Sequence, residues 1–204
     1  MGTSTENRET GAQGGLNGQG EALIVIDYTY DFIAQDGKLT CGAPGQDIER
    51  GLLQLTRQFV DAGRWVVFAV DVHDPEDPYH PETRLFPPHN LRGTKGRELY
   101  GRVGEYYRGL QQQGVPSHVL WLDKTRYSAF AGTDLELKLR TREVHTLHLA
   151  GVCTDICVLH TAVDAYNRGF SIVVHAGSVA SFNPIGHTWA LDHFQTCLGA
   201  QVVE

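Results

Sequence analysis

The sequence has 204 residues, of which 41% are hydrophobic and 20% are charged, the balance of one globular domain. The net charge is −7, and Lys and Arg are scattered, so a nucleic-acid backbone would be repelled and is not an expected partner. No apolar run is long enough for a membrane span, and the N-terminus lacks the pattern of a signal peptide. These features predict a cytoplasmic protein without a membrane partner. They leave the oligomeric state open, a homo-oligomer included.

The first 20 residues are polar and rich in glycine, with almost nothing to bury. This composition predicts a disordered leader. We expect residues 21–204 to form a single folded domain, because we find neither an internal repeat nor a linker in them.

Short apolar runs of the kind found in buried parallel strands recur along this domain. They cover 22–26, 65–70, 118–122, 145–150, 170–174 and 200–203. Apolar residues at helical spacing lie between them, most clearly over 48–59 and 156–166. Strands that alternate with helices predict an α/β fold: a doubly wound, mostly parallel six-stranded sheet with helices on both faces.

Reactive side chains follow the first four apolar runs. Asp27, Asp71 and Lys124 come after the first three, and the segment from Gly151 to Cys157 comes after the fourth. In open parallel sheets, ligands bind beyond the carboxyl ends of the strands. The topology therefore directs two carboxylates, an ammonium and a thiol to one edge of the sheet.

Cys157 is the best candidate for a nucleophile. It falls in the first turn of a helix for which Thr154 or Asp155 is a plausible N-cap, and the helix dipole there favours a thiolate with a lowered pKa. The surroundings of Cys41 and Cys197 indicate inert thiols. We therefore expect both to have no catalytic role.

Asp27 and Lys124 suit the chemistry of such a thiol. A partly desolvated Asp27 could take the thiol proton and return it to a leaving amine. Lys124 would favour the charged forms of the other two groups. A thioredoxin-like redox role is unsupported, because three residues separate Cys153 from Cys157 instead of two.

The long segment from Val72 to about Thr94 is rich in Pro, His and acidic residues, which indicates a functional loop. Asp71 and His73 stand at i and i+2, on one side of an extended chain. Glu82 and His89 could complete a set of nitrogen and oxygen ligands, with His80 as a competitor. Such a set suits zinc, manganese or iron.

Several strings together resemble the isochorismatase-like cysteine hydrolases, and within them the nicotinamidases. The strings cover 22–27, 31–32, 71–73, 80–82, 85–90, 93–94, 124–130 and 151–158. The resemblance runs from about residue 22 to the C-terminus. The segment from Val72 to about Thr94, called the metal loop below, favours the nicotinamidases, since many relatives that act on other amides lack it.

This resemblance implies a catalytic triad of Asp27, Lys124 and Cys157, with an oxyanion hole formed by the backbone amides of Cys153 and Cys157. It also implies a cis peptide bond between Val152 and Cys153, whose thiol can then be idle.

For the ligands, the resemblance implies a divalent metal, zinc first, with His80 as a neighbour only. The metal ligands would be Asp71, His73, Glu82 and His89. The walls of the substrate site would be Phe32, Phe86 and Tyr127. The implied reaction converts nicotinamide to nicotinate and ammonia through a thioester on Cys157.

Two alternatives stay open. One is a related amidase that acts on another small carboxamide, or on a carbamoyl or ureido compound. The other is a metal-binding or scaffold protein without activity, although the intact set of Asp27, Lys124 and Cys157 argues against it. The sequence does not decide whether pyrazinamide is also a substrate.

Overall fold

The computed structural model describes residues 20–204, so the leader predicted over residues 1–20 lies outside the described part of the chain, apart from Gly20. Strands and helices alternate along the chain. The strands are β1 Glu21–Ile26, β2 Trp65–Asp71, β3 Val119–Lys124, β4 Thr146–Val152, β5 Ser171–Ala180 and β6 Gln201–Val203. The α-helices are α1 Tyr30–Ile33, α2 Ala43–Asp47, α3 Glu49–Asp61, α4 Gly101–Gln113, α5 Leu135–Arg140, α6 Leu159–Asn167 and α7 Pro184–Thr196. Two 3₁₀ turns, η1 Pro81–Arg84 and η2 Lys95–Arg97, and a π-helical turn, η3 Thr154–Val158, complete the fold.

The six strands form one sheet in the order β3-β2-β1-β4-β5-β6. Every neighbouring pair is parallel, so the predicted α/β fold is confirmed and the sheet is wholly parallel. The chain winds outward from β1 to β3, returns to the centre at β4 and winds outward again. The strand order therefore reverses between β1 and β4, and ligands bind at such a crevice in open α/β sheets.

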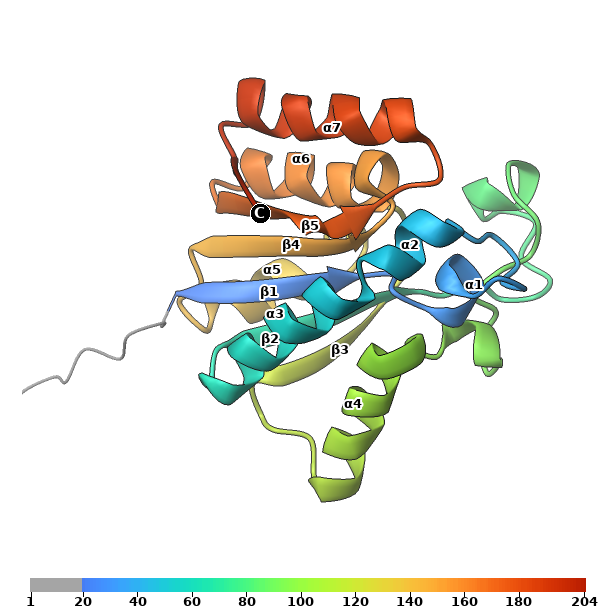
Figure 1. Ribbon diagram of the computed structural model, residues 1–204, viewed down its shortest axis with the longest axis horizontal. Coiled ribbons are helices and arrows are strands. Elements are labelled where there is room, and N and C mark those ends of the chain that lie inside the picture. The colour runs from blue at the N-terminus through green and yellow to red at the C-terminus, as the bar shows by residue number, and fades with distance from the viewer. Residues whose placement is uncertain (1–19) are drawn as a thin grey trace, which may run out of the picture.

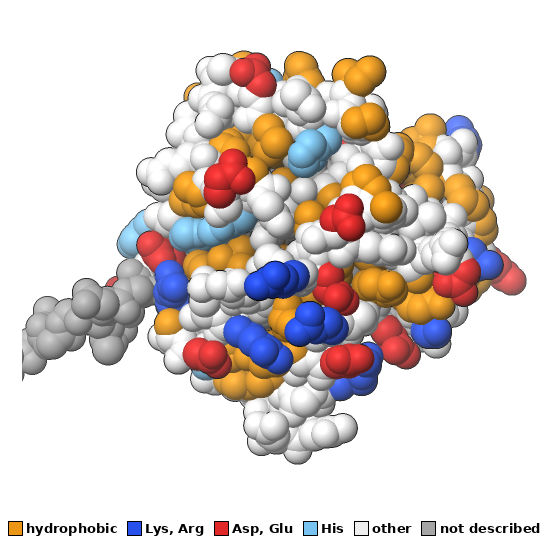
Figure 2. All heavy atoms as spheres, in the orientation of Figure 1, with side chains coloured by type: hydrophobic (Ala, Val, Ile, Leu, Met, Phe, Trp, Pro, Cys, Tyr) orange, Lys and Arg blue, Asp and Glu red, His pale blue; other side chains and the backbone are white. Residues whose placement is uncertain are grey.

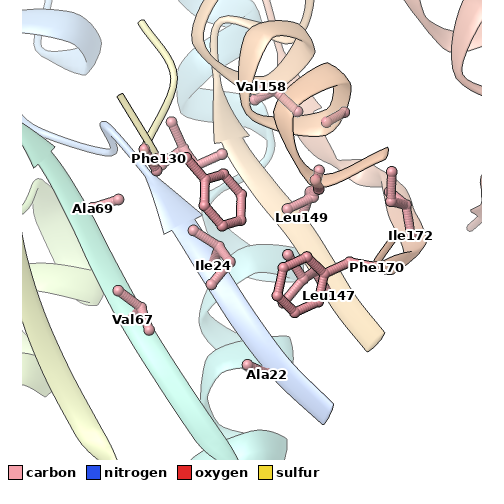
Figure 3. Close-up of a cluster of buried hydrophobic side chains, with 14 of the residues drawn as sticks. Ala22, Ile24, Val67, Ala69, Phe130, Leu147, Leu149, Val158, Phe170 and Ile172 are labelled. Atoms are coloured by element: carbon pink, nitrogen blue, oxygen red, sulfur yellow. The ribbon is translucent and has the colours of Figure 1, made fainter. Parts of the chain in front are cut away.

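Alternate residues of the central strand serve two separate cores. Ile24 and Ile26 pack with the side that carries α5, α6 and α7, whereas Leu23 and Val25 pack with the side that carries α3 and α4. Figure 3 shows the first of these cores, where Ile24 lies among side chains from β2, β4 and the helices. Burial on both faces explains why β1 reads as a continuous apolar run.

The carboxyl ends of the strands point to the side of the molecule where α1 and the loop between β2 and α4 lie (Figure 1). That loop is the long segment predicted to be functional. It folds back on itself, because His73 and Leu91 form an isolated parallel bridge. His73 N donates to Asn90 O at 3.2 Å, and Arg92 N donates to His73 O at 2.9 Å. These bonds hold the far end of the loop against its start.

Charges of both signs are interspersed on the face that α3 covers (Figure 2). Within residues 20–204, no helix is long and apolar enough to cross a membrane.

Candidate functional site

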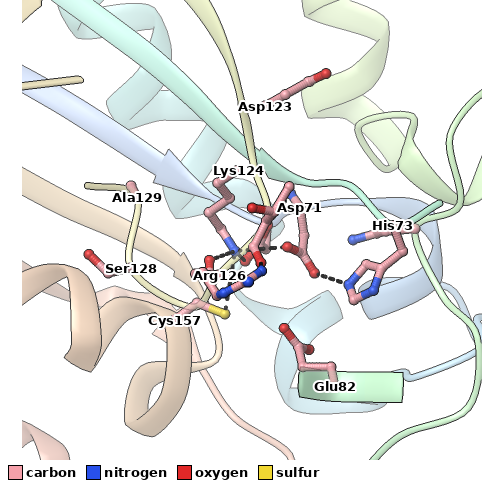
Figure 4. A network of polar contacts seen from close by, with 12 residues as sticks. Asp71, His73, Glu82, Asp123, Lys124, Arg126, Ser128, Ala129 and Cys157 are labelled. Carbon is pink, nitrogen blue, oxygen red and sulfur yellow. Dashed lines mark hydrogen bonds and ion pairs between the residues drawn. The ribbon is translucent and has the colours of Figure 1, made fainter. Parts of the chain in front are cut away.

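A buried ion pair lies at the reversal point of the sheet. Lys124 Nζ is 2.7 Å from Asp27 Oδ2 and 3.7 Å from Cys157 Sγ. The exposed fraction is zero for Asp27 and Lys124 and 6% for Cys157. Figure 4 shows Cys157 and Lys124 directed toward each other from different elements. The structure thus brings together the three residues predicted to react.

Asp27 is held in place by the neighbouring strand β2. It follows the last residue of β1, and its φ of 53° turns the chain out of the sheet. Asp71 N donates a hydrogen bond of 2.8 Å to Asp27 Oδ1, while Asp27 N donates to Ala69 O at 2.9 Å. One carboxylate oxygen is therefore fixed by the backbone, and the other faces Lys124.

Burial sets the protonation of this group. Desolvation raises the pKa of Asp27 to about 6, although Lys124 lowers it in part. For Lys124, burial alone would lower the pKa, but Asp27 and Asp71 outweigh it and hold the pKa well above its usual range. At neutral pH, Asp27 is thus a carboxylate of raised basicity beside a fixed ammonium, as a general base requires.

The expectation of a lowered thiol pKa at Cys157 is wrong for this structure. Burial raises the pKa of the Cys157 thiol well above its usual range, and Lys124 offsets the rise only in part. The helix also begins earlier than expected: its N-cap is Cys153, and neither Thr154 nor Asp155 takes that place. Cys157 lies in the π-helical turn, a feature that often marks functional sites. A buried thiol needs a base to remove its proton, and Asp27 is the neighbour that can do so.

Four side chains gather beside this group, all of them buried. One ligand atom from each lies within 4.8 Å of the others, and the residues are Asp71, His73, Glu82 and His89. Asp71 Oδ2 is 2.6 Å from His73 Nε2, and Glu82 Oε2 is 3.5 Å from His89 Nε2. Figure 4 shows Glu82 pointing into the space that Asp71 and His73 face. This cluster could bind a metal ion.

The chemistry of the cluster fits a divalent cation. His89 Nε2 is buried and has no hydrogen-bond partner among the described residues. Burial would lower the pKa of His89, but Asp71 and Glu82 outweigh it and raise the pKa to about 10. The carboxylates of Asp71 and Glu82 thus stabilise positive charge beside His89, and a bound metal ion would be stabilised in the same way.

His80 lies beside the cluster without joining it. Its ring stands 4.1 Å from the ring of His73, but both of its nitrogens are engaged elsewhere. Nε2 contacts Thr125 O at 2.8 Å, and Nδ1 accepts a hydrogen bond from Glu82 N at 3.3 Å. This arrangement agrees with the prediction that His80 is a neighbour of the metal ligands.

One carboxylate joins the two groups. Asp71 Oδ2 faces His73, while Asp71 Oδ1 is 3.5 Å from Lys124 Nζ. The proximity of Lys124 and the two histidines holds the pKa of Asp71 well below its usual range, although burial alone would raise it. Asp71 therefore stays charged and contacts both the four-residue cluster and the group of Asp27, Lys124 and Cys157.

An apolar cavity adjoins Cys157. Phe32, Phe86 and Tyr127, the predicted walls, all line it together with Glu82 and Cys153. Three further lining residues were not found from the sequence: Leu39, Ile156 and Phe182. Only Ile156 lies near a recognised motif, and nothing in the pattern around the other two indicates a binding site.

The surroundings of Cys153 show one expected and one unexpected feature. The peptide bond between Val152 and Cys153 is cis, as the resemblance implied. The sulfur atoms of Cys41 and Cys153, both buried, lie 3.2 Å apart, a contact between distant segments that the sequence did not indicate. Cys197, in contrast, is exposed at the end of α7.

A second contact that sequence reasoning missed supports the metal loop. The buried carboxylate of Asp31 accepts a hydrogen bond of 2.8 Å from Asn90 N, and Thr29 Oγ1 donates to Asn90 Oδ1 at 3.0 Å. Asn90 has a left-handed φ of 45° and directly follows His89. The segment after β1 therefore fixes the position of this histidine.

Comparison with known proteins agrees with the geometry. The family model described as "Isochorismatase domain" matches residues 21–204. This chain belongs to the isochorismatase family.

Within the isochorismatase family, the relatives cover about nine tenths of this chain. The "Uncharacterized isochorismatase family protein PncA" of Bacillus subtilis is 63% identical over 90% of this chain and 99% of its own length. A crystal structure of "nicotinamidase/pyrazinamidase PncA" from Bacillus subtilis superimposes with a TM-score of 0.88 at 61% identity, over 90% of this chain and 99% of that one. A Pyrococcus horikoshii pyrazinamidase solved "in complex with zinc" is 28% identical with a TM-score of 0.77, over 91% of this chain and 99% of that one.

Proposed function

We propose that this protein is a nicotinamidase, a hydrolase that converts nicotinamide to nicotinate and ammonia through a thioester on Cys157. The observation that carries the proposal is the joining of two buried groups through Asp71: the set of Asp27, Lys124 and Cys157, and the four-ligand cluster. The likeness to a nicotinamidase structure at 61% identity supports the same substrate.

In the proposed first half-reaction, Asp27 takes the proton of the Cys157 thiol, and the sulfur bonds to the amide carbon. The backbone amides of Cys153 and Cys157 stabilise the oxyanion, each contributing about 3 kcal/mol to barrier lowering. Asp27 then passes its proton to the amide nitrogen, the carbon–nitrogen bond breaks, and ammonia leaves. The acyl group stays on the sulfur as a thioester.

In the second half-reaction, Asp27 removes a proton from a water molecule, whose oxygen bonds to the thioester carbon. The carbon–sulfur bond breaks, Asp27 returns its proton to the sulfur, and the acid product loses its own proton to water and leaves as nicotinate. Lys124 stays charged throughout, because Asp27 and Asp71 hold its pKa above the usual range despite burial. Its ammonium offsets negative charge as it moves between Asp27 and the sulfur.

Asp71, His73, Glu82 and His89 are the proposed ligands of a divalent transition metal, zinc first, with manganese or iron as alternatives. A bound metal ion would supply a Lewis acid to hold the pyridine nitrogen of the substrate. Phe32, Phe86 and Tyr127 are the proposed walls for its flat ring. A cytoplasmic location remains our prediction, and the sequence leaves the oligomeric state open, a homo-oligomer included.

The deciding experiment measures ammonia release from nicotinamide by the purified protein, before and after chelation and after zinc is restored. We expect turnover that is lost on chelation and regained with zinc. A parallel panel of pyrazinamide, a carbamoyl amino acid and a ureido acid tests the related amidases. Turnover of a panel compound with none of nicotinamide would assign the protein to another amidase.

A further inference from the structure

The apolar cavity beside Cys157 is too small for its proposed substrate. Its free volume is about 20 Å³, which is room for roughly one water molecule. A pyridine ring with a carboxamide is several times larger. A shift of a lining side chain would therefore widen the path by which an amide reaches the sulfur.

Phe182 is the lining side chain with the most freedom to move. It is 45% exposed, whereas the other lining side chains are buried or half-buried. Phe32 is 6% exposed, and its ring packs against that of His89 at 5.2 Å. Exposed side chains change rotamer within nanoseconds, while buried ones are held by close packing. Rotation of Phe182 is thus the least costly way to enlarge the cavity.

The backbone on both sides of Phe182 is fixed. Ser181 Oγ donates a hydrogen bond of 2.6 Å to Asp155 Oδ1 and accepts one of 3.2 Å from Asn183 N. The side chain of Asn183 caps α7 by accepting from Gly186 N at 3.1 Å. Movement is therefore confined to the side chain of Phe182.

These bonds also tie Phe182 to the nucleophile. Asp155 lies two residues before Cys157 in the same π-helical turn. A further bond of 2.8 Å joins the side chains of Thr154, in that turn, and His187, in α7. The backbone at Phe182 is thus held at a fixed place relative to Cys157, and its ring can act as a wall for a ring bound there.

We propose that the side chain of Phe182 gates the substrate cavity, forms its outer wall, and determines which amides reach Cys157. Its ring rotates outward to admit a flat aromatic amide and returns to cover it. The proposed role of Phe182 in substrate choice rests on the proposed function, whereas its proposed role in access to the Cys157 sulfur does not. Two experiments test these two roles separately.

The first experiment measures access to Cys157 without any amide. In a Cys197→Ser background, which removes the exposed thiol, Cys157 is alkylated with iodoacetamide or with a bulky fluorescein iodoacetamide, and peptide mass spectrometry follows the rates. We expect Phe182→Ala to raise the ratio of bulky to small reagent rates about tenfold, and Phe182→Trp to lower it. Ile185→Ala is the matched control, because Ile185 is 81% exposed near the start of α7 and does not line the cavity.

The second experiment measures kcat and KM for nicotinamide and for the larger quinoline-3-carboxamide. Phe182→Ala should raise KM for nicotinamide about tenfold by removing an apolar wall, and shift the kcat/KM ratio toward the quinoline amide by a similar factor. Phe182→Leu should restore part of the wild-type preference. Thermal melting checks the fold, and Phe182→Leu replaces the alanine variant if the latter is unfolded.

Unchanged ratios in both experiments would overturn the proposal. They would favour entry through a second cavity that Glu82 and Phe86 also line, which has a volume of about 240 Å³ and is lined in addition by Asp74, Glu76 and Asp77. A changed alkylation ratio without turnover of any amide would support the gating role of Phe182 and contradict the proposed function. Nicotinamide turnover with unchanged ratios would support the proposed function and contradict the gating role of Phe182.

Discussion

The triad and the metal cluster share a carboxylate but are built from different kinds of structure. Asp27 and Lys124 stand at strand ends, and Cys157 in the turn that follows β4, so the sheet itself sets their positions. Three of the four proposed metal ligands, His73, Glu82 and His89, belong to the loop between β2 and α4. That loop is positioned by a few cross-links, such as the bond from Asn90 N to Asp31.

The two groups therefore differ in how firmly their side chains are held in place. Parallel strands packed on both faces leave little freedom at their ends, so the reacting groups share the rigidity of the core. The side chains of a loop stay in place only while the cross-links of the loop hold. We therefore expect changes in the triad to affect chemistry alone, and changes in the loop to affect metal binding first.

Cys157→Ala should give the largest effect. Loss of the nucleophile is expected to lower ammonia release about ten-thousandfold or more, because no other group can carry the acyl intermediate. Metal analysis should show unchanged occupancy, since the four ligands stay. Cys197→Ala, at an exposed thiol, is the control. Retained turnover in Cys157→Ala would remove the thioester from the mechanism.

His89→Ala should weaken metal binding by the four-residue cluster. With one of four ligands gone, we expect loss of bound metal and a rise in KM for nicotinamide of about a hundredfold. His80→Ala is the matched control, because the nitrogens of His80 contact the backbone at Thr125 and Glu82. If His80→Ala lost the metal and His89→Ala kept it, the assignment of these two histidines would be wrong.

The pH dependence of kcat/KM should report on Asp27. Burial raises its pKa to about 6, and the base must be ionised to accept the thiol proton. Activity is therefore expected to fall as pH decreases through about 6, by about tenfold between pH 7 and pH 5. A profile that stays flat down to pH 4.5, with stable protein, would exclude Asp27 as the base.

Cys153→Ala should give the smallest effect. Only the backbone amide of Cys153 is proposed to act, so kcat/KM is expected to stay within about threefold of wild type. The substitution removes the sulfur contact with Cys41, a small loss that thermal melting will measure. A hundredfold loss of kcat at unchanged stability would instead show that the Cys153 thiol takes part.

The sequence predicted best what regular structure determines. The sheet and the residues at its strand ends followed from apolar runs, because each strand is buried on both faces. The direction of the Cys157 pKa shift was predicted wrongly. A position in the first turn of a helix favours the thiolate, but burial raises the pKa, and the local sequence around Cys157 does not show how deeply the thiol is buried. Phe182 and the contact of Asp31 with Asn90 were missed because they join segments far apart in the chain.

The two oxygens of Asp71 have a thermodynamic consequence. One faces the metal ligand His73 and the other faces Lys124, so metal binding and proton binding draw on the same carboxylate. Linkage is reciprocal: if a bound ion changes the proton affinity of the triad, protons must change the affinity for the ion by the same factor. A substitution at Asp71 itself is therefore expected to change both the proton affinity of the triad and the affinity for the ion.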